Sequence, residues 1–251
     1  MKTRTFSVIV PDNPDLLLAL ATRIWKKHQQ DGVNSILPPA LMALFQIKLD
    51  IARAENTRCK DLDRLKEKLI EERNLLLGLH RNQNAYSEGT VRYFVTAVRD
   101  ILLGHYRGSE RMLGNWGYTV NTPKKSVRIL IPTGPNPLIQ LAKNILQKHD
   151  NDGANSLLHH LDLEALRMKL AEAEKKQEDA AKAMRDKENA TQTRNLALGI
   201  ERGQTSKTPN TVKYIVKSIR DLLLGYCRGR EQELGDWGFE VNTRAWGSGA
   251  R

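Results

Sequence analysis

The chain of 251 residues has little cysteine and no long apolar segment. Its two cysteines, Cys59 and Cys227, lie in no metal-ligand spacing and hold non-equivalent places in the repeat described below, so we expect no structural disulfide and a reducing compartment. The apolar run at residues 6–10 is far too short for a signal-peptide core or a membrane span. We therefore expect a soluble, cytoplasmic protein that does not enter a membrane.

The sequence also lacks a recurring set of reactive side chains. There is no nucleophile with its base, no repeated pair of carboxylates, and no glycine-rich loop between a strand and a helix. The adjacent His159 and His160 have no further ligands at a recognisable spacing, so we expect no metal there. His28 and His149 fall near the ends of expected helices, where the helix dipole favours a cation. We predict a protein that is not an enzyme and uses no cofactor.

The chain instead contains one sequence module that occurs twice in tandem. Residues 99–122 return 121 positions later as residues 220–243, and the register holds without a gap back to the start of both copies. We predict two tandem modules, residues 1–122 and 123–243, followed by a flexible tail at 244–251. Each module has a common domain size, and a hydrophobic content of 40% is enough for a core in each.

Short β-like runs open and close each copy. Residues 6–10 and 127–131 form the opening runs, which proline stops, and residues 118–120 and 239–241 form the closing runs. If the helices between them return the chain to its start, the closing run lies antiparallel to the opening one. The predicted fold class is mainly α: tandem duplicated helical bundle modules, each with short β-strands at its N- and C-terminal ends.

Helical periodicity occupies the rest of each copy. A first helix is expected at residues 14–30 and again at 137–151. The last helix is expected to begin at Ser87 or Thr208, both of which are good N-cap residues. Its buried row is predicted to be Val91, Val95, Val98 and Leu102 in the first copy, and Val212, Val216, Ile219 and Leu223 in the second.

Between these helices, residues 40–81 and 161–202 contain no proline and no glycine except Gly78 and its copy Gly199. Apolar residues of the second copy step by three and four, which is typical of a narrow packing seam and favours one continuous helix. In the first copy the apolar register shifts, and this permits a break near residues 56–61. The sequence is therefore compatible with one long helix and also with two shorter helices.

The most closely repeated stretch is Leu-Gly-x-Trp-Gly. It predicts a turn that folds the tryptophan ring over the open end of the bundle. Its residues are Leu113, Gly114, Trp116 and Gly117 in the first copy, and Leu234, Gly235, Trp237 and Gly238 in the second. With the preceding Arg-Asp-x-Leu-Leu-Gly, this ending resembles that of bacterial helical-bundle proteins without an established function. The resemblance covers residues 90–122 and 211–243, implies a bacterial helical bundle, and brings no catalytic residue or cofactor.

Two functional hypotheses follow from the sequence. The first is a non-enzymatic structural or interaction protein that self-assembles or binds a protein partner, with the opening run as a strand-pairing edge at Phe6, Val8 and Val10. The second is a nucleic-acid-binding protein, because the net charge of +11 favours polyanions. Its contacts would come from basic residues of the last helices: Arg92, Arg99, Lys213, Lys217 and Arg220.

Overall fold

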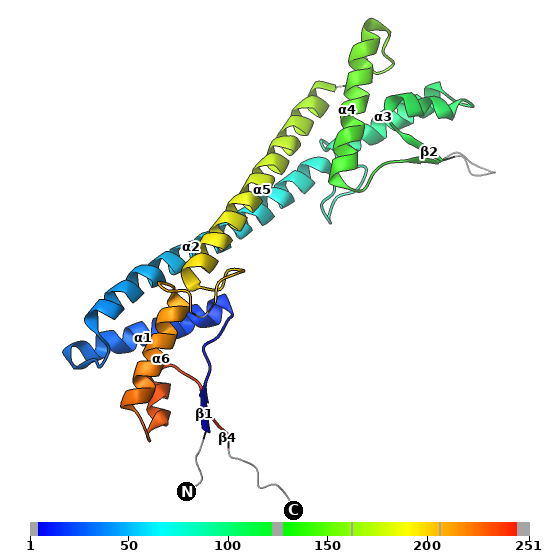
Figure 1. Ribbon diagram of the computed structural model, residues 1–251. Helices are drawn as coiled ribbons and strands as arrows, with labels where there is room; N and C mark the ends of the chain where they lie inside the picture. The colour runs from blue at the N-terminus through cyan, green and yellow to red at the C-terminus, as the bar shows by residue number, and fades with distance from the viewer. Residues whose placement is uncertain (1–4, 122–127, 162, 206, 245–251) are drawn as a thin grey trace, which may run out of the picture. The chain divides into compact units, whose positions relative to one another are not determined.

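The computed structural model describes residues 5–121, 128–161, 163–205 and 207–244, and the chain is mainly helical as predicted (Figure 1). The first copy contains β1 (Thr5–Val8), α1 (Pro14–Asp31), the 3-10 helix η1 (Gly32–Asn34), α2 (Pro39–Leu77), α3 (Val91–His105), the 3-10 helix η2 (Glu110–Trp116) and β2 (Thr119–Asn121). The second contains β3 (Arg128–Leu130), α4 (Pro135–Asp152), η3 (Gly153–Asn155), α5 (Leu163–Leu198), α6 (Val212–Tyr226), η4 (Glu231–Trp237) and β4 (Val241–Arg244).

The first helix of each copy lies where the sequence predicts it. The side chain of Asn13 caps α1 by accepting hydrogen bonds from the backbone N–H groups of Asp15 and Leu16, at 3.0 and 3.2 Å. Pro14 occupies the first turn, where its missing N–H group is not needed. At the other end, the N–H group of Gly32 bonds the carbonyl of His28 and closes the helix.

The last helix begins one turn later than predicted in both copies. The N-caps are Thr90 and Thr211, whose hydroxyls accept from the N–H groups of Tyr93 and Tyr214. Ser87, the predicted cap, instead accepts from Asn84 within the preceding turn. The buried rows are confirmed, because all eight apolar residues predicted for α3 and α6 are buried.

The long middle segments are single helices, which decides between the two alternatives. α2 runs for 39 residues and α5 for 36 residues without interruption. At 1.5 Å per residue, α2 is about 58 Å long. The chain therefore cannot return from the end of α2 to α1 within the same copy.

The described residues form two compact units, and neither coincides with one sequence module. Unit 1 combines the residues up to Asp61 with those from Asp186 onward, and unit 2 comprises residues 62–185. Each unit thus contains the first part of one copy and the last part of the other. Both chain connections between the units run inside helices, one within α2 and one within α5.

Each unit closes with a two-stranded antiparallel sheet that joins the two copies. In unit 1, β1 pairs with β4, so that Val8 faces Val241, and in unit 2 β2 pairs with β3, so that Val120 faces Ile129 (Figure 1). The predicted antiparallel pairing of opening and closing runs is therefore present, but between copies rather than within one. The length of α2 explains this difference, because it separates the two ends of its own copy.

The two cores use equivalent repeat positions. In unit 1, Leu17, Leu20 and Ile24 of α1 share a core with Ile219 and Leu223 of α6. In unit 2, the residues 121 positions away do the same: Leu138, Leu141 and Ile145 of α4 with Val98 and Leu102 of α3. The apolar pattern of the repeat therefore specifies the same kind of core in unit 1 and in unit 2.

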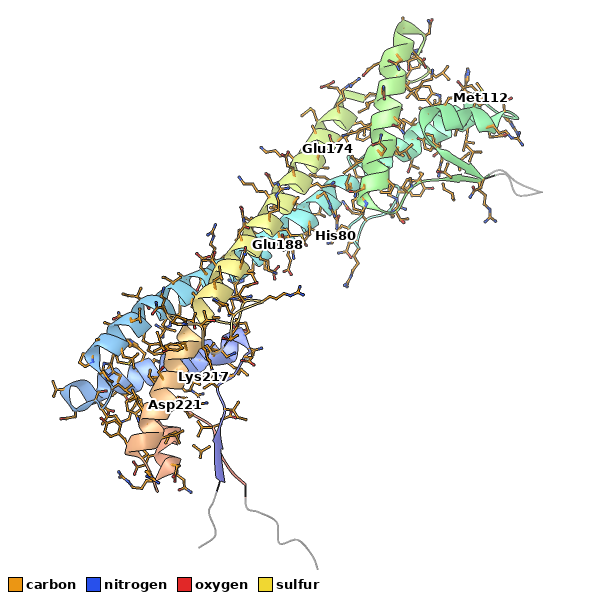
Figure 2. The ribbon with its side chains drawn as sticks, in the orientation of Figure 1. His80, Met112, Glu174, Glu188, Lys217 and Asp221 are labelled. Atoms are coloured by element: carbon orange, nitrogen blue, oxygen red, sulfur yellow. The ribbon has the colours of Figure 1, made fainter. Side chains whose placement is uncertain are left out.

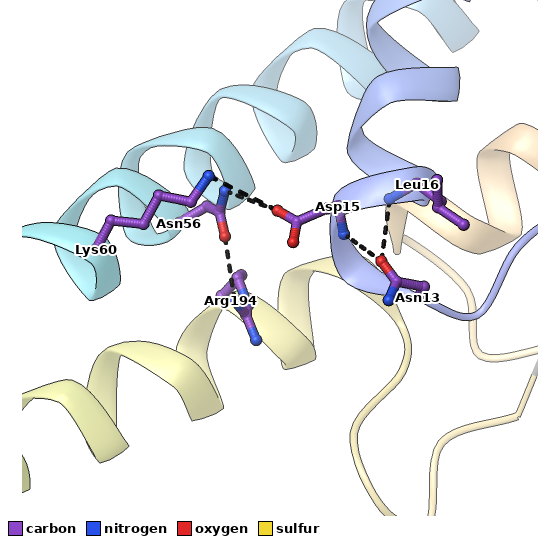
Figure 3. A network of polar contacts seen from close by, with 6 residues as sticks. All are labelled: Asn13, Asp15, Leu16, Asn56, Lys60 and Arg194. Carbon is purple, nitrogen blue, oxygen red and sulfur yellow. Dashed lines mark hydrogen bonds and ion pairs between the residues drawn. The ribbon is translucent and has the colours of Figure 1, made fainter. Parts of the chain in front are cut away.

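A polar network ties three helices together in unit 1 (Figure 3). Arg194 of α5 donates to Asn56 of α2 at 3.1 Å, and Asn56 donates to Asp15 of α1 at 3.5 Å. Lys60 adds an ion pair with Asp15 at 3.8 Å. The network fixes the entry of α1 against the two long helices.

The end of α2 requires a glycine. Gly78 has φ +75°, and a Cβ atom there would lie 2.6 Å from the hydroxyl of Thr90, the cap of α3. We expect Gly78→Ala to lower the free energy of unfolding by more than about 1 kcal/mol. Gly104→Ala is the control, because Gly104 lies in α3 with open space around it and alanine favours a helix by up to about 1 kcal/mol. Urea denaturation checks both, and equal effects would contradict the predicted clash.

Candidate interaction surface

The closing motif is part of the core and not a free surface. Trp116 and Trp237 are only 1% and 5% exposed, and Leu113 and Leu234 are fully buried. Each tryptophan ring lies under a lysine of the other copy: Lys148 Nζ is 5.7 Å from the Trp116 ring centre, and Lys27 Nζ is 5.9 Å from that of Trp237. The motif therefore joins the end of one copy to the first helix of the other.

The second glycine of the motif permits this close packing. Gly117 and Gly238 adopt left-handed conformations with φ +89° and +88°. A Cβ atom at Gly117 would lie 2.8 Å from Cβ of Asn144 on α4, and one at Gly238 would lie 2.9 Å from Cβ of Arg23 on α1. The first glycine, Gly114 or Gly235, has open space around it. The sequence predicted the turn, but not that it packs against the other copy.

One buried hydroxyl follows the motif in the first copy only. Tyr118 is 3% exposed, and its hydroxyl donates to the carbonyl of Val95 at 2.6 Å. Burial raises the pKa of Tyr118 above its ordinary value. Phe239 takes the same place in the second copy and is equally buried. Both copies therefore bury an aromatic ring at this position, and only the first copy adds a hydroxyl to it.

Most of the residues predicted to contact a polyanion are paired within the protein. Arg99 and Arg220 bind the neighbouring Asp100 and Asp221 at 2.7 and 2.8 Å. Lys213 binds Asp12 at 2.5 Å, and its side chain is only 14% exposed. The Nε atom of Arg92 is buried and has no hydrogen-bond partner among the described residues. These cations are therefore largely committed to internal contacts.

Lys217 differs from the others. It lies on α6 between Lys213 and Arg220, and Figure 2 shows it on the same helix as Asp221. Burial, followed by repulsion from Lys213 and Arg220, lowers the pKa of its ammonium group. The equivalent residue of the first copy is Thr96, which is buried and donates to the Arg92 carbonyl. This basic row therefore occurs in one copy only.

The predicted strand edge is used inside the chain. Phe6 and Val8 belong to β1 and pair with Thr243 and Val241 of β4, and the Val8 carbonyl also accepts from Arg220 at 3.4 Å. Val10 follows the strand and is 9% exposed. One edge of β1 is thus occupied by the end of the same chain. Arg244 lies in β4, and the rest of the predicted tail lies outside the described residues.

An apolar stripe that the sequence analysis did not single out lies on the outer face of α2 in unit 1. Ile47 and Ile51 are 58% and 40% exposed and stand one helical turn apart. Ala43 and Ala54 are also exposed and extend the stripe in both directions. The core residues Phe45, Leu49 and Ala52 of the same segment are fully buried. α2 therefore presents apolar side chains both toward the core and away from it.

The second copy provides an internal comparison for this stripe, which we call the α2 stripe (Ala43, Ile47, Ile51 and Ala54). The equivalent residues of α5 are Glu164, Met168, Glu172 and Lys175, and all four are exposed. The core positions of the two helices correspond, so the fold does not demand apolar residues on the outer face. The requirements of the fold therefore do not account for the difference.

The cavities and acidic or histidine clusters offer no alternative site. A mainly apolar cavity of about 210 Å³ in unit 1 is lined by Ile9, Pro11, Leu16, Ala19, Leu20, Arg23, Gly238 and Glu240. A more polar cavity in unit 2 has a volume of about 250 Å³, and both volumes lie below the usual range for ligand sites. Within the described residues, no group of His, Cys, Asp or Glu is placed to hold a metal ion. No helix of this part of the chain is both long and apolar enough to cross a membrane.

The two faces of α2 should respond differently to truncation. Leu49→Ala removes a fully buried side chain and should lower the free energy of unfolding by about 2–5 kcal/mol. Ile51→Ala removes an exposed side chain and should change it by less than about 0.5 kcal/mol. Chemical denaturation followed by circular dichroism measures both values, and similar losses would contradict the placement of the stripe.

Tyr118→Phe should lower the free energy of unfolding by about 1 kcal/mol, because it removes a buried hydrogen bond. The raised pKa means that only the unfolded chain ionises this tyrosine near its ordinary pKa of about 10. The contribution of Tyr118 to the free energy of unfolding is therefore complete below that pH and is lost as the pH rises above it. The difference between wild type and variant should therefore shrink from about pH 9 to about pH 11. Tyr86→Phe, at a 74% exposed position, is the control and should show no difference.

Comparisons with protein-family models, with curated proteins and with solved structures find no significant match to the chain. The resemblance of the closing motif to bacterial helical-bundle proteins therefore stays a prediction. The functional argument rests on the chain's own residues.

Proposed function

We propose that the chain is a non-enzymatic interaction protein that binds a protein partner through the α2 stripe of unit 1. The observation that carries the proposal is the contrast between the two long helices. The same outer positions are apolar on α2 and mostly charged on α5, although both helices fill equivalent core positions. Exposed apolar side chains that folding does not require are typical of binding surfaces.

The stripe has the geometry of a helix-docking surface. Ala43, Ile47, Ile51 and Ala54 follow steps of four, four and three residues, which places them along one side of the helix. Such a row accepts the apolar side of an amphipathic helix of a partner, and the two isoleucines supply most of its apolar area. A second copy of the chain and a different protein are both partners of this kind.

The polyanion alternative has weaker support. Of the five predicted contacts, Arg99, Lys213 and Arg220 already bind carboxylates of the chain, and only Arg92 and Lys217 make no ion pair among the described residues. Nucleic-acid binding requires several cations that are available to phosphates. The positive charge is therefore assigned to the general surface.

The repeat itself supports a further part of the proposal, that the chain arose as a tandem duplication of one helical module in a bacterial cytoplasmic protein. Core positions of the two units correspond one to one at an offset of 121 residues. Both copies have the same core positions, and only the first has an apolar outer face on its long helix.

A photo-reactive amino acid placed at Ile47, in the cells that naturally make the protein, tests the proposal. Irradiation should give a covalent adduct of higher mass, and mass spectrometry would identify the partner. Adding Ile51→Glu should abolish the adduct without changing the helix content, because a charge in the stripe opposes burial.

The matched control places the same photo-reactive group at Met168, the equivalent position of α5, which is 66% exposed. The proposal expects no adduct there. Adducts at both positions in equal amounts, or at neither, would show that the α2 stripe is not a specific binding surface.

A further inference from the structure

The contacts that close both units lie between two parts of the chain that meet covalently only at residues 122–127. We call residues 5–121 the first half-chain and residues 128–244 the second half-chain. Both sheets, both cores and both tryptophan–lysine contacts join the first half-chain to the second. Cutting the chain between Asn121 and Arg128 would leave every one of these contacts in place.

Neither half-chain can complete a unit by itself. In the first half-chain, α1 contributes to the core of unit 1 and α3 to the core of unit 2, and α2 runs between the two units. The core faces of α1 and α3 are each covered by the second half-chain: Ile24 shares its core with Ile219, and Val98 shares its core with Ile145. Each half-chain therefore presents two apolar faces that only a complementary half-chain covers.

Ion pairs between the half-chains favour unlike partners. Glu72 of α2 binds Lys176 of α5 at 2.6 Å, and this pairing lowers the pKa of Glu72 and raises that of Lys176. If two first half-chains paired with each other, Glu55 would replace Lys176 and place two carboxylates together. Pairing of two second half-chains would set Lys176 against Thr193. Discrimination of this kind depends on the unfavourable contact as much as on the favourable one.

A second ion pair disfavours one of the two like pairings. Lys213 of α6 binds Asp12, which follows β1, at 2.5 Å. In a pair of second half-chains, Lys213 would meet Thr133 and lose its carboxylate. In a pair of first half-chains, Asp12 would meet Arg92 and keep an opposite charge, so this contact disfavours only the pairing of two second half-chains. Selection against two first half-chains comes from the Glu72–Lys176 pair, and the shared apolar pattern of the repeat supplies the common core.

We propose that the two half-chains are mutually specific binding partners that join without a peptide link, so that two copies of the chain exchange half-chains and form a closed dimer when the link is too short for pairing within one chain. Every contact of the exchanged dimer is already present within one chain. The link between the half-chains favours the single chain, because it holds the partners at a high effective concentration. This assembly does not depend on the α2 stripe. A result that contradicts one of the two proposals therefore leaves the other unaffected.

Shortening the link tests the exchange. Asn121 and Arg128 are directly paired across β2 and β3, and reversing an antiparallel pair requires a turn of at least about two residues. Deleting residues 122–127 leaves no residue to connect the paired Asn121 and Arg128, so the half-chains of one molecule can no longer pair with each other. Light scattering after gel filtration should give twice the mass of one chain, and a folded monomer would overturn the proposal.

Cleaving the link provides a second test that does not depend on folding of the deletion variant. A specific protease site is inserted between Lys124 and Lys125 of the full chain, and the folded protein is then cut. The fragments should remain together in a 1:1 complex with the helix content of the uncut protein. Separation of the fragments, or sorting into pairs of like fragments, would overturn the proposal.

Charge variants of the cut protein test the specificity. Glu72→Lys places two cations together and should raise the dissociation constant of the fragments at least about threefold. Adding Lys176→Glu restores an opposite pair and should return the constant to its original value. Glu67→Lys is the control, because Glu67 lies exposed on the same helix and makes no ion pair in the part of the chain that the structure describes, and it should change the constant little. Equal effects of the variants at residues 72 and 67 would contradict the role of the ion pair.

Discussion

The continuity of α2 and α5 is the constraint on which the rest of the structure depends. α2 runs without interruption for 39 residues, and its two ends are buried in different cores. Phe45 and Leu49 belong to the core of unit 1, and Leu77 belongs to that of unit 2. α1 and α3 of one copy consequently cannot pack against each other. Each must be covered by the other copy, and the cross-paired sheets and the tryptophan–lysine contacts follow from that.

The sequence repeat places two versions of each element in one chain, and comparing them distinguishes residues that the fold requires from residues that it does not require. Residues that agree in both copies, such as Trp116 and Trp237 or Gly117 and Gly238, lie at the contacts that close the units. Residues that differ at equally exposed positions are free of that requirement. Ile47 and Ile51 belong to this second group, and for that reason they carry the functional proposal. The ion pair of Glu72 with Lys176 also differs between copies, and it gives each half-chain a preferred partner.

The sequence predicts the elements well because local periodicity determines them. The buried rows of α3 and α6, the first helices and three of the four short strands agree with the structure. The last strand was predicted at residues 239–241, whereas β4 begins only at Val241 and runs to Arg244. The pairing between copies could not be predicted, because equivalent apolar faces fit either copy and only the unbroken helices decide between them. The caps at Thr90 and Thr211 were missed since a serine or threonine three residues earlier is an equally good cap by type. A helical projection of residues 43–54 would have found the α2 stripe, which lies opposite the core residues of the same segment.

Distances between methyl groups of the first and last helices test the central claim, that each unit is built from both copies. Ile24 of α1 shares a core with Ile219 and Leu223 of α6, whereas a unit built from one contiguous module would place it beside Val98 and Leu102 of α3. In a protein with labelled methyl groups, nuclear Overhauser effects should connect the methyls of α1 with those of α6. Effects that connect α1 with α3 instead would contradict the account.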